Sequence, residues 1–157
     1  MKALARLLND MRSSEVIDEY ALFGATAQMR YTEPVATLVA DVLVAVPSSS
    51  EGLDVMSGIH EFCVGRGYLP EGESIRVGAW PTQFVPVFSP LTREALEHAE
   101  TADFDGVPLR VVRPDHLAVI ALNVGRAKDF TRILALLESG SVSGLQIRRL
   151  AAQHGLA

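Results

Sequence analysis

The spacing of apolar and polar positions changes several times along the chain, from the period of a helix to that of a strand and back. Residues 1–12 place leucines and a methionine three and four positions apart, which predicts an amphipathic helix. Residues 37–46, TLVADVLVAV, are rich in Val and Leu and end at a proline, which predicts a strand. Before this strand the pattern predicts a strand over 20–23, a tight turn at Gly24 and a short helix over 25–31. After it we expect a helix from a capping box at Ser48 and Glu51 to about Arg66, strands over 74–77 and 82–88 with Trp80 on the turn between them, and a helix over 89–99. The last part predicts a hairpin that turns at Asp105-Gly106 and helices over 114–124, 128–137 and 143–154.

This order of elements predicts an α+β fold, in which a small mixed sheet is flanked by helices. All the predicted strands fall within residues 1–112, and residues 113–157 are predicted to be helical. We therefore expect an α/β core over 1–112 and a C-terminal helical part over 113–157 that packs on it, as a single domain overall. A chain of 157 residues is long enough for one sizeable core.

Composition and charge narrow the classes of function. Hydrophobic residues make up 48% of the chain, so either the core is large or some apolar surface meets a partner. The formal net charge is −5, which argues against a broad electrostatic contact with nucleic acid. The apolar segments are too short to span a bilayer, and polar residues interrupt the first one too early for a secretory signal. We therefore expect a cytoplasmic protein with no membrane contact.

Three segments resemble, in order and spacing, the polymerase-β-type nucleotidyltransferases, and more narrowly the minimal and abortive-infection (AbiE-type) nucleotidyltransferases of bacteria. YALFGATAQMRYTEPVATLVADVLV is similar to their apolar strand, Gly-Gly or Gly-Ser turn, short helix and Thr-x-Asp-x-Asp strand. PTQFVPVFSPLTREAL is similar to the strand that brings their third carboxylate, with the helix after it. VPLRVVRPDHLAVIALNVGRAKDFTRILALL is similar to their Pro-Glu-Asp-Leu helix and the Gly-Arg-x-Lys-Asp turn that follows. The resemblance runs from about Tyr20 to the C-terminus and implies a nucleotidyltransferase-like fold.

The resemblance also implies a site for nucleotidyl transfer. That reaction uses divalent metals, and Mg²⁺ takes oxygen ligands in octahedral geometry. Two carboxylates at i and i+2 of a strand face the same side, and a third from a neighbouring strand completes the cage. In this sequence Asp41 takes the second acidic position, whereas Val39 takes the first and Gln83 the third. Gly24 and Ala25 take the turn that offers backbone N–H groups to the phosphates.

Asp41 has three interpretations on this basis. It is a metal ligand in a working or weakened site, a remnant satisfied by an arginine, a backbone turn or water, or part of a new binding site without metal. One carboxylate and one amide make a poor Mg²⁺ site, so the remnant interpretation is favoured. No cofactor is then expected, and Mg²⁺ is expected only if the chain is active. Glu33, Asp54 and Asp105 are the acidic residues that could replace a missing ligand.

The segment GRAKDF offers two basic residues, Arg126 and Lys128, that could contact nucleotide phosphates from across the cleft. In the alternative, which we favour, the segment is a local loop in which Asp129 caps the next helix or pairs with Arg132. Asn123 stands where the resembled family has a lysine.

The remaining reactive side chains have structural interpretations. The histidines lack the spacing of a zinc site, and each is predicted to lie at the surface or at a helix end: His60, His98, His116 and His154. The single cysteine, Cys63, allows no intrachain disulfide or cysteine zinc site and is predicted to be a small buried residue.

Three functions remain open. The favoured one is a catalytically silent protein with a degenerate nucleotidyltransferase site that acts through a protein partner or self-association, for which the resemblance suggests a toxin–antitoxin setting. The alternative is an active nucleotidyltransferase that moves NMP from Mg-NTP to a protein or RNA hydroxyl. The third is a sensor that binds a nucleotide or another anion without chemistry.

Overall fold

The computed structural model describes residues 1–32, 39–47 and 56–156. Within these residues the helices are α1 (Lys2–Ser13), α2 (Gly24–Gln28), α3 (Ser57–Gly65), α4 (Pro90–Glu97), α5 (Pro114–Val124), α6 (Ala127–Glu138) and α7 (Gly144–Gln153). The strands are β1 (Glu19–Phe23), β2 (Ala40–Ala45), β3 (Pro70–Glu71), β4 (Ser74–Val77), β5 (Trp80–Pro86), β6 (Glu100–Phe104) and β7 (Val107–Val111). The predicted α+β class is confirmed.

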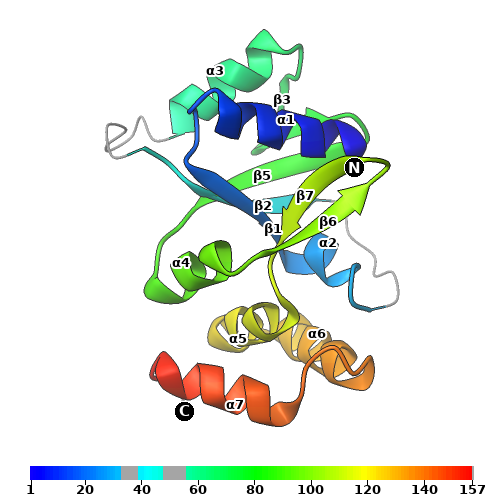
Figure 1. The fold of residues 1–157 in the computed structure, drawn as a ribbon, viewed down its shortest axis with the longest axis vertical. Coiled ribbons are helices and arrows are strands. Elements are labelled where there is room, and N and C mark those ends of the chain that lie inside the picture. Colours follow the sequence, from blue (N-terminus) through cyan, green and yellow to red (C-terminus); the bar gives the residue numbers. More distant parts are fainter. Residues whose placement is uncertain (33–38, 48–55, 157) are drawn as a thin grey trace.

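The described strands form one mixed sheet in the order β3-β4-β5-β2-β1-β7-β6 (Figure 1). At its centre, β2 runs antiparallel to β1 and parallel to β5, and β1 runs parallel to β7. The hairpins β4–β5 and β6–β7 extend the sheet on either side. Three consecutive residues of β1 and three of β2 are buried, so both faces of the central strands are covered.

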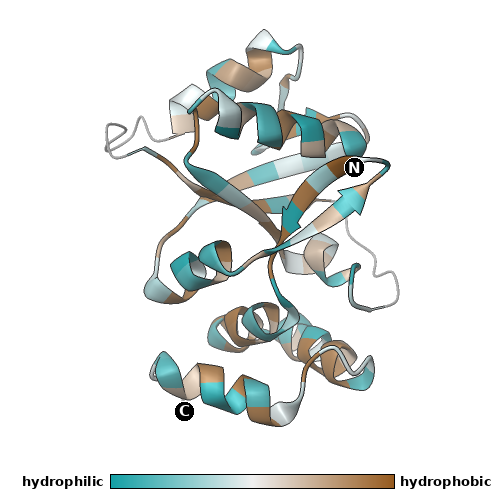
Figure 2. Cartoon of the chain, in the orientation of Figure 1, coloured by the Kyte–Doolittle hydropathy of each residue, from teal (hydrophilic) through white to brown (hydrophobic). Residues whose placement is uncertain are grey.

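The helices cover the sheet from two sides. Figure 1 shows α1 and α3 above the sheet and α4 to α7 below it. In Figure 2, α1, α4 and α7 carry alternating apolar and polar positions, which is the pattern of helices with one buried face. Helix α1 confirms its prediction, since Leu4, Leu7, Leu8 and Met11 are all buried. None of the helices in the described residues is long and apolar enough to cross a membrane.

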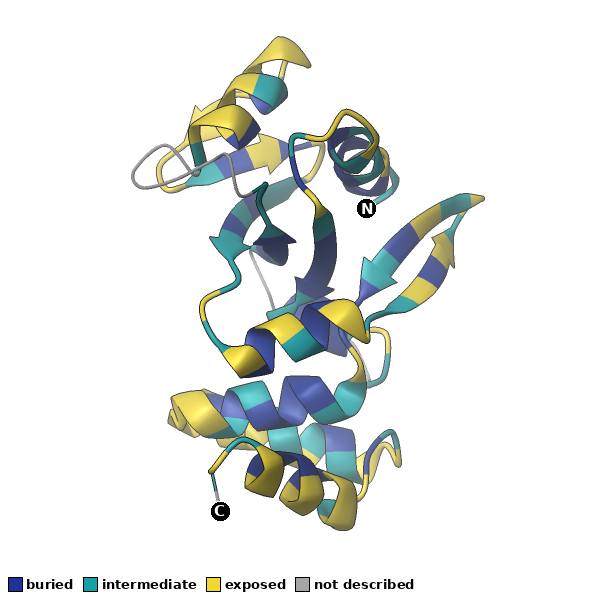
Figure 3. Ribbon diagram, turned by 60° about the vertical axis from the view of Figure 1, so that its left-hand side comes forward, coloured by how far each residue is buried: buried dark blue, intermediate teal, exposed yellow. Residues whose placement is uncertain are grey.

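Helix α5 is the centre of the C-terminal helical layer. It packs against α4, α6 and α7, and Figure 3 shows its buried positions between α4 and α7. The helix spans the predicted range because Pro114 occupies its first turn and Gly125, with φ of +73°, ends it in the left-handed conformation. Helix α7 begins at the predicted capping box, in which Ser143 and Gln146 exchange hydrogen bonds.

Four local predictions differ from the structure. Helix α2 ends at Gln28 rather than Tyr31. Helix α3 begins at Ser57, and the capping box proposed at Ser48 and Glu51 lies outside the described residues. Trp80 is not on the turn but is the first residue of β5, where it packs half-buried against the core. The short strand β3 was not predicted, because two exposed residues carry no alternation.

Candidate functional site

A cavity of about 580 Å³ opens where the end of β1 and the start of β2 meet the helices α2, α5 and α6. Its volume lies in the range of small-molecule sites. The lining includes the residues that the resemblance assigned to a catalytic, metal or nucleotide role: Gly24, Ala25, Val39, Asp41, Gln83, Arg126 and Lys128. The fold therefore brings these residues together, from segments a hundred residues apart. Their roles remain predictions.

Strand register places Asp41 between two neighbours. It lies opposite Phe23 of β1 on one side and opposite Gln83 of β5 on the other. Because successive side chains of a strand alternate between faces, Val39 lies on the same side as Asp41. The three positions that the resemblance assigns to acids thus lie together, and two of them hold side chains without charge.

Gly24 begins α2 directly beside Asp41. Its φ is +69°, a conformation that favours glycine, and a Cβ atom there would lie 2.8 Å from Asp41 Oδ2. That distance is shorter than an ordinary contact, so a side chain at position 24 would have to displace the carboxylate. The glycine turn and the carboxylate are therefore packed against each other.

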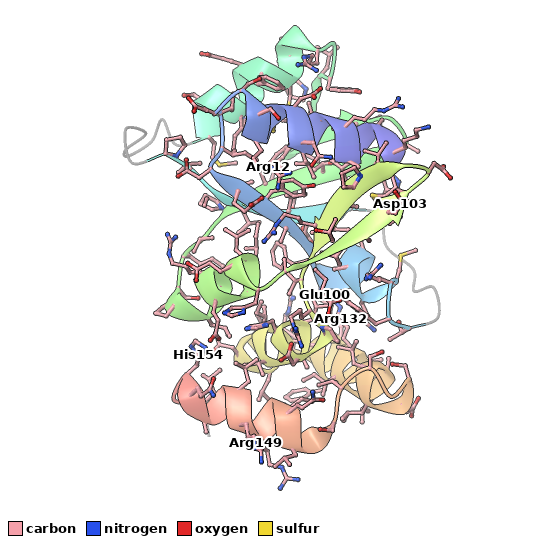
Figure 4. The ribbon with its side chains drawn as sticks, in the orientation of Figure 1. Arg12, Glu100, Asp103, Arg132, Arg149 and His154 are labelled. Atoms are coloured by element: carbon pink, nitrogen blue, oxygen red, sulfur yellow. The ribbon has the colours of Figure 1, made fainter. Side chains whose placement is uncertain are left out.

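The surroundings of Asp41 are basic. Burial raises the pKa of the Asp41 carboxyl, and the positive charges of Arg132, Lys128 and Arg126 oppose this increase without cancelling it. All three cations come from α6 or its N-cap, and all three line the cavity. Figure 4 shows Arg132 between α6 and the lower edge of the sheet. The sequence did not single out Arg132 as a cavity residue, although it lies one helical turn after Lys128.

Asp129 is the second carboxylate of the cavity, and it is paired locally. It is 1% exposed and accepts hydrogen bonds from the backbone N–H of Arg126 at 3.1 Å and from its Nε at 2.7 Å. Arg132 Nη1 lies 3.4 Å from its other oxygen. The hydrogen bonds from Arg126 lower the pKa of Asp129, which stays ionised. The favoured prediction, a capping and pairing role for Asp129, is confirmed.

These residues do not fit a divalent metal. Val39 has no ligand atom, Gln83 offers one neutral oxygen, and Asp129 is engaged by arginine. Among residues 1–32, 39–47 and 56–156, no three His, Cys, Asp or Glu side chains are grouped so as to hold a metal ion. Asp105 lies at the turn of the β6–β7 hairpin, at the end of the sheet away from the cavity. Glu33 and Asp54 lie outside the described residues.

Part of the cavity lining is apolar. Phe23 of β1 and a stripe of α5 that includes Leu117, Ile120 and Val124 form this part. Gln28, which the sequence did not single out, also lines the cavity; its side chain is 2% exposed. A ligand with an apolar body and an anionic end would match such a cavity.

A second polar cluster lies away from the cavity, between α4, α5 and α7. Glu94 Oε2 contacts Nε2 of His116 at 3.2 Å and Nε2 of His154 at 2.6 Å. Figure 4 shows His154 at the end of α7, close to α4. Of the surface or helix-end prediction, the surface half is wrong for His116, which is 5% exposed, but His116 does lie at a helix end, in the first turn of α5. The prediction is confirmed for exposed His60 on α3, and for His98 and His154, which end α4 and α7.

The charge of His116 reflects two opposing effects. Burial disfavours the imidazolium, but the Asp115 and Glu94 carboxylates outweigh burial, so that the pKa of His116 is raised. Nδ1 lies 3.4 Å from Asp115 Oδ1, a charge contact without hydrogen-bond geometry. Cys63 is buried as predicted, and burial raises the pKa of its thiol to about 11, which keeps the thiol protonated.

The sequence matches no protein-family model and no curated protein. Solved structures are similar in fold. An antigenic nucleotidyltransferase-like protein from Paracoccidioides brasiliensis matches with a TM-score of 0.61 at 10% identity, over 96% of this chain and 84% of that chain. The antibiotic-resistance factor ANT(2'')-Ia, in complex with adenylyl-2''-tobramycin, matches with a TM-score of 0.57 at 12% identity, over 96% and 94%. The Megavirus polyadenylate synthase matches with a TM-score of 0.50 at 16% identity, over 88% of this chain and 32% of that chain.

These likenesses show that the fold is nucleotidyltransferase-like, as the resemblance implied. At 10–16% identity they show the fold alone, and they say nothing of the narrower abortive-infection type.

Proposed function

We propose that this chain is a catalytically silent protein of nucleotidyltransferase-like fold that acts through a protein partner or a second copy of itself. The proposal of catalytic silence rests on the side chains around Asp41. Of the three cavity-lining positions that the resemblance assigns to carboxylates, two hold uncharged side chains, Val39 and Gln83. Without a cluster of anionic ligands, the cavity lacks what nucleotidyl transfer requires to bind two divalent metals.

Exposed apolar side chains support the second half. Phe130 and Leu134 of α6 are 48% and 57% exposed and lie four residues apart, on one side of the helix. Leu145, in the first turn of α7, is 53% exposed. Large apolar side chains that neighbour one another on an exposed helix face, as Phe130 and Leu134 do, are typical of protein interfaces. A toxin–antitoxin pair of the abortive-infection type would supply such a partner and is the most specific form of the proposal.

The test of catalytic silence is a transfer assay with labelled ATP, GTP, CTP and UTP. Purified protein is incubated with each NTP, Mg²⁺ or Mn²⁺, and total RNA or protein from bacterial cells as the acceptor. We expect no label above that of the Asp41→Asn variant. Label transferred by the wild-type chain and lost in Asp41→Asn would instead support the alternative, an active enzyme that moves NMP from Mg-NTP to a hydroxyl.

The test of association is light scattering after size-exclusion chromatography. If a second copy covers α6, the wild-type chain elutes as a dimer, and Leu134→Glu elutes as a monomer with unchanged circular dichroism. The matched control is Val64→Glu, an exposed apolar residue of α3, which lies on the opposite side of the sheet from α6 (Figure 1). A wild-type monomer at high concentration, together with no partner recovered from host cells, would contradict this half of the proposal.

A further inference from the structure

The cavity contains an excess of positive charge that no metal site would require. Its lining holds three cations, Arg126, Lys128 and Arg132, and two carboxylates, Asp41 and Asp129. Asp129 is already paired with the two arginines. Lys128 is exposed, and none of the ion pairs between described residues includes it.

We propose that this cavity binds a phosphate-bearing organic anion without a divalent ion, and that the Asp41 carboxylate weakens this binding. The inference rests on the same carboxylate-poor cavity as the proposed function, but it assigns the cavity a ligand. It does not depend on whether α6 meets a partner.

The basic side of the cavity fits the phosphate end of such a ligand. Arginine guanidinium groups suit phosphate oxygens, and the ammonium group of Lys128 adds a second kind of donor. Helix α6 directs its N-terminal end to the same place, which adds a partial positive charge. Both arginines are held by Asp129, so they are ordered before any ligand arrives.

The apolar side fits the body of the ligand. Phe23, Leu117, Ile120 and Val124 form a wall that a phosphate alone would leave uncovered. The volume of about 580 Å³ accommodates an organic body in addition to a phosphate group. An organic phosphate would therefore contact both the basic and the apolar lining residues, whereas inorganic phosphate would contact only the basic ones.

Asp41 has opposite effects in the two kinds of site. In a metal site it is a ligand, and its removal abolishes metal-dependent binding. In a site without metal its charge repels the incoming phosphate, so its removal strengthens binding. A unit charge at roughly 6 Å in water-like surroundings corresponds to about a threefold change in affinity for each ligand charge at that distance, so one or two nearby phosphate charges give about three- to tenfold.

Isothermal titration in EDTA tests the inference with three probes: inorganic phosphate, pyrophosphate and ATP. We expect ATP to bind more tightly than pyrophosphate, pyrophosphate more tightly than phosphate, and all affinities to fall as salt is raised. Asp41→Asn should bind ATP about three- to tenfold more tightly than the wild type. Lys128→Gln should bind at least about threefold more weakly.

The chain offers a matched control, since its only other lysine is Lys2. Lys2 belongs to α1, on the opposite side of the sheet (Figure 1), so Lys2→Gln should bind like the wild type. Position 128 is exposed, so Lys128→Gln tests the site without a risk to folding.

Several results would overturn the inference. The first is that none of the probes binds in EDTA. The second is binding that appears only with Mg²⁺ and vanishes in Asp41→Asn. The third is equal affinity for ATP and pyrophosphate, which would show that the apolar lining residues have no role. The second result would also remove the argument for catalytic silence from the missing carboxylates, and the transfer assay would then decide whether the chain is active. A positive transfer assay with metal-independent binding intact would overturn the proposed function alone.

Discussion

The contact between Gly24 and Asp41 makes a quantitative prediction about stability. Replacing Gly24 by alanine places a Cβ 2.8 Å from Asp41 Oδ2 and keeps a residue with a side chain at φ of +69°. The left-handed conformation costs about 1–2 kcal/mol for a residue other than glycine. Moving the short Asp41 side chain off its rotamer costs about 0.5–1.5 kcal/mol more. We expect Gly24→Ala to lower the free energy of unfolding by about 2–3 kcal/mol.

Urea unfolding at equilibrium measures this change, and two variants separate its parts. Gly140 has φ of +74°, and a Cβ atom at that position would meet nothing within 4 Å, so Gly140→Ala reports the backbone cost alone, about 1–2 kcal/mol. In Asp41→Ala the clashing oxygen is gone, and the Cβ of residue 41 would lie 3.5 Å from the new methyl group, an ordinary contact.

A double-mutant cycle of Gly24→Ala and Asp41→Ala should therefore show a coupling of about 0.5–1.5 kcal/mol. Strictly additive changes would refute the close packing of the turn against the carboxylate. So would a Gly24→Ala variant that is no less stable than Gly140→Ala.

Three further predictions concern hydrogen bonds and charge outside the cavity. Tyr20→Phe removes the hydroxyl that donates to Asn9 Oδ1 at 2.7 Å, and should cost about 1–2 kcal/mol in urea unfolding; an unchanged midpoint would contradict it. Ser89→Ala removes the N-cap of α4 and should cost about 1 kcal/mol by the same measurement, whereas the conservative Ser89→Thr should cost less. Because the pKa of His116 is raised in the folded chain, its positive charge stabilises the fold at pH values below the ordinary histidine pKa. This stabilisation is lost as the pH rises from the ordinary pKa through the raised one, so the melting temperature should fall between these two pH values. Glu94→Gln should flatten this dependence, and an equally steep profile in the variant would contradict the assignment.

Much of the fold could be predicted because its boundaries are marked locally. Helix α5 has a proline at its start and a glycine at its end, and α7 has the capping pair Ser143 and Gln146. Trp80 was misplaced because the turn signal of a nearby glycine and proline covers several residues, whereas the sheet register that draws Trp80 into β5 is set by its pairing with Val77. Local signals mark where an element ends only to within a few residues.

Only those residues of the candidate site that belong to a motif of the resembled family could be predicted from the sequence. The resemblance led to Gly24, Asp41 and Gln83, and the cavity contains all three. Arg132 has no motif, and its place in the cavity follows from how α6 packs. The cluster of Glu94 with His154 joins residues sixty positions apart, so no local spacing could indicate it.

The balance of charge around Asp41 leads to a last prediction, in which the cavity changes from an anion site to a cation site. Val39→Asp and Gln83→Asp together would place three carboxylates in the cavity lining, at position 39 just before β2, in β2 and in β5, and carboxylate oxygens are the ligands that Mn²⁺ prefers. The added negative charges would also repel a phosphate from the same three cations of α6. We expect the double variant to bind Mn²⁺, measured by titration calorimetry, and to lose metal-free binding of ATP.

The matched control is the double variant Val39→Asn and Gln83→Asn, which has nearly the same shapes and no added charge. It should bind ATP without metal as the wild type does, and it should not bind Mn²⁺. A three-carboxylate variant that folds, ignores Mn²⁺ and still binds ATP in EDTA would mean that charge at these positions does not decide what the cavity holds. The cause would then have to lie in the shape of the cavity rather than in the missing acids, because the basic residues of α6 are the same in all three proteins.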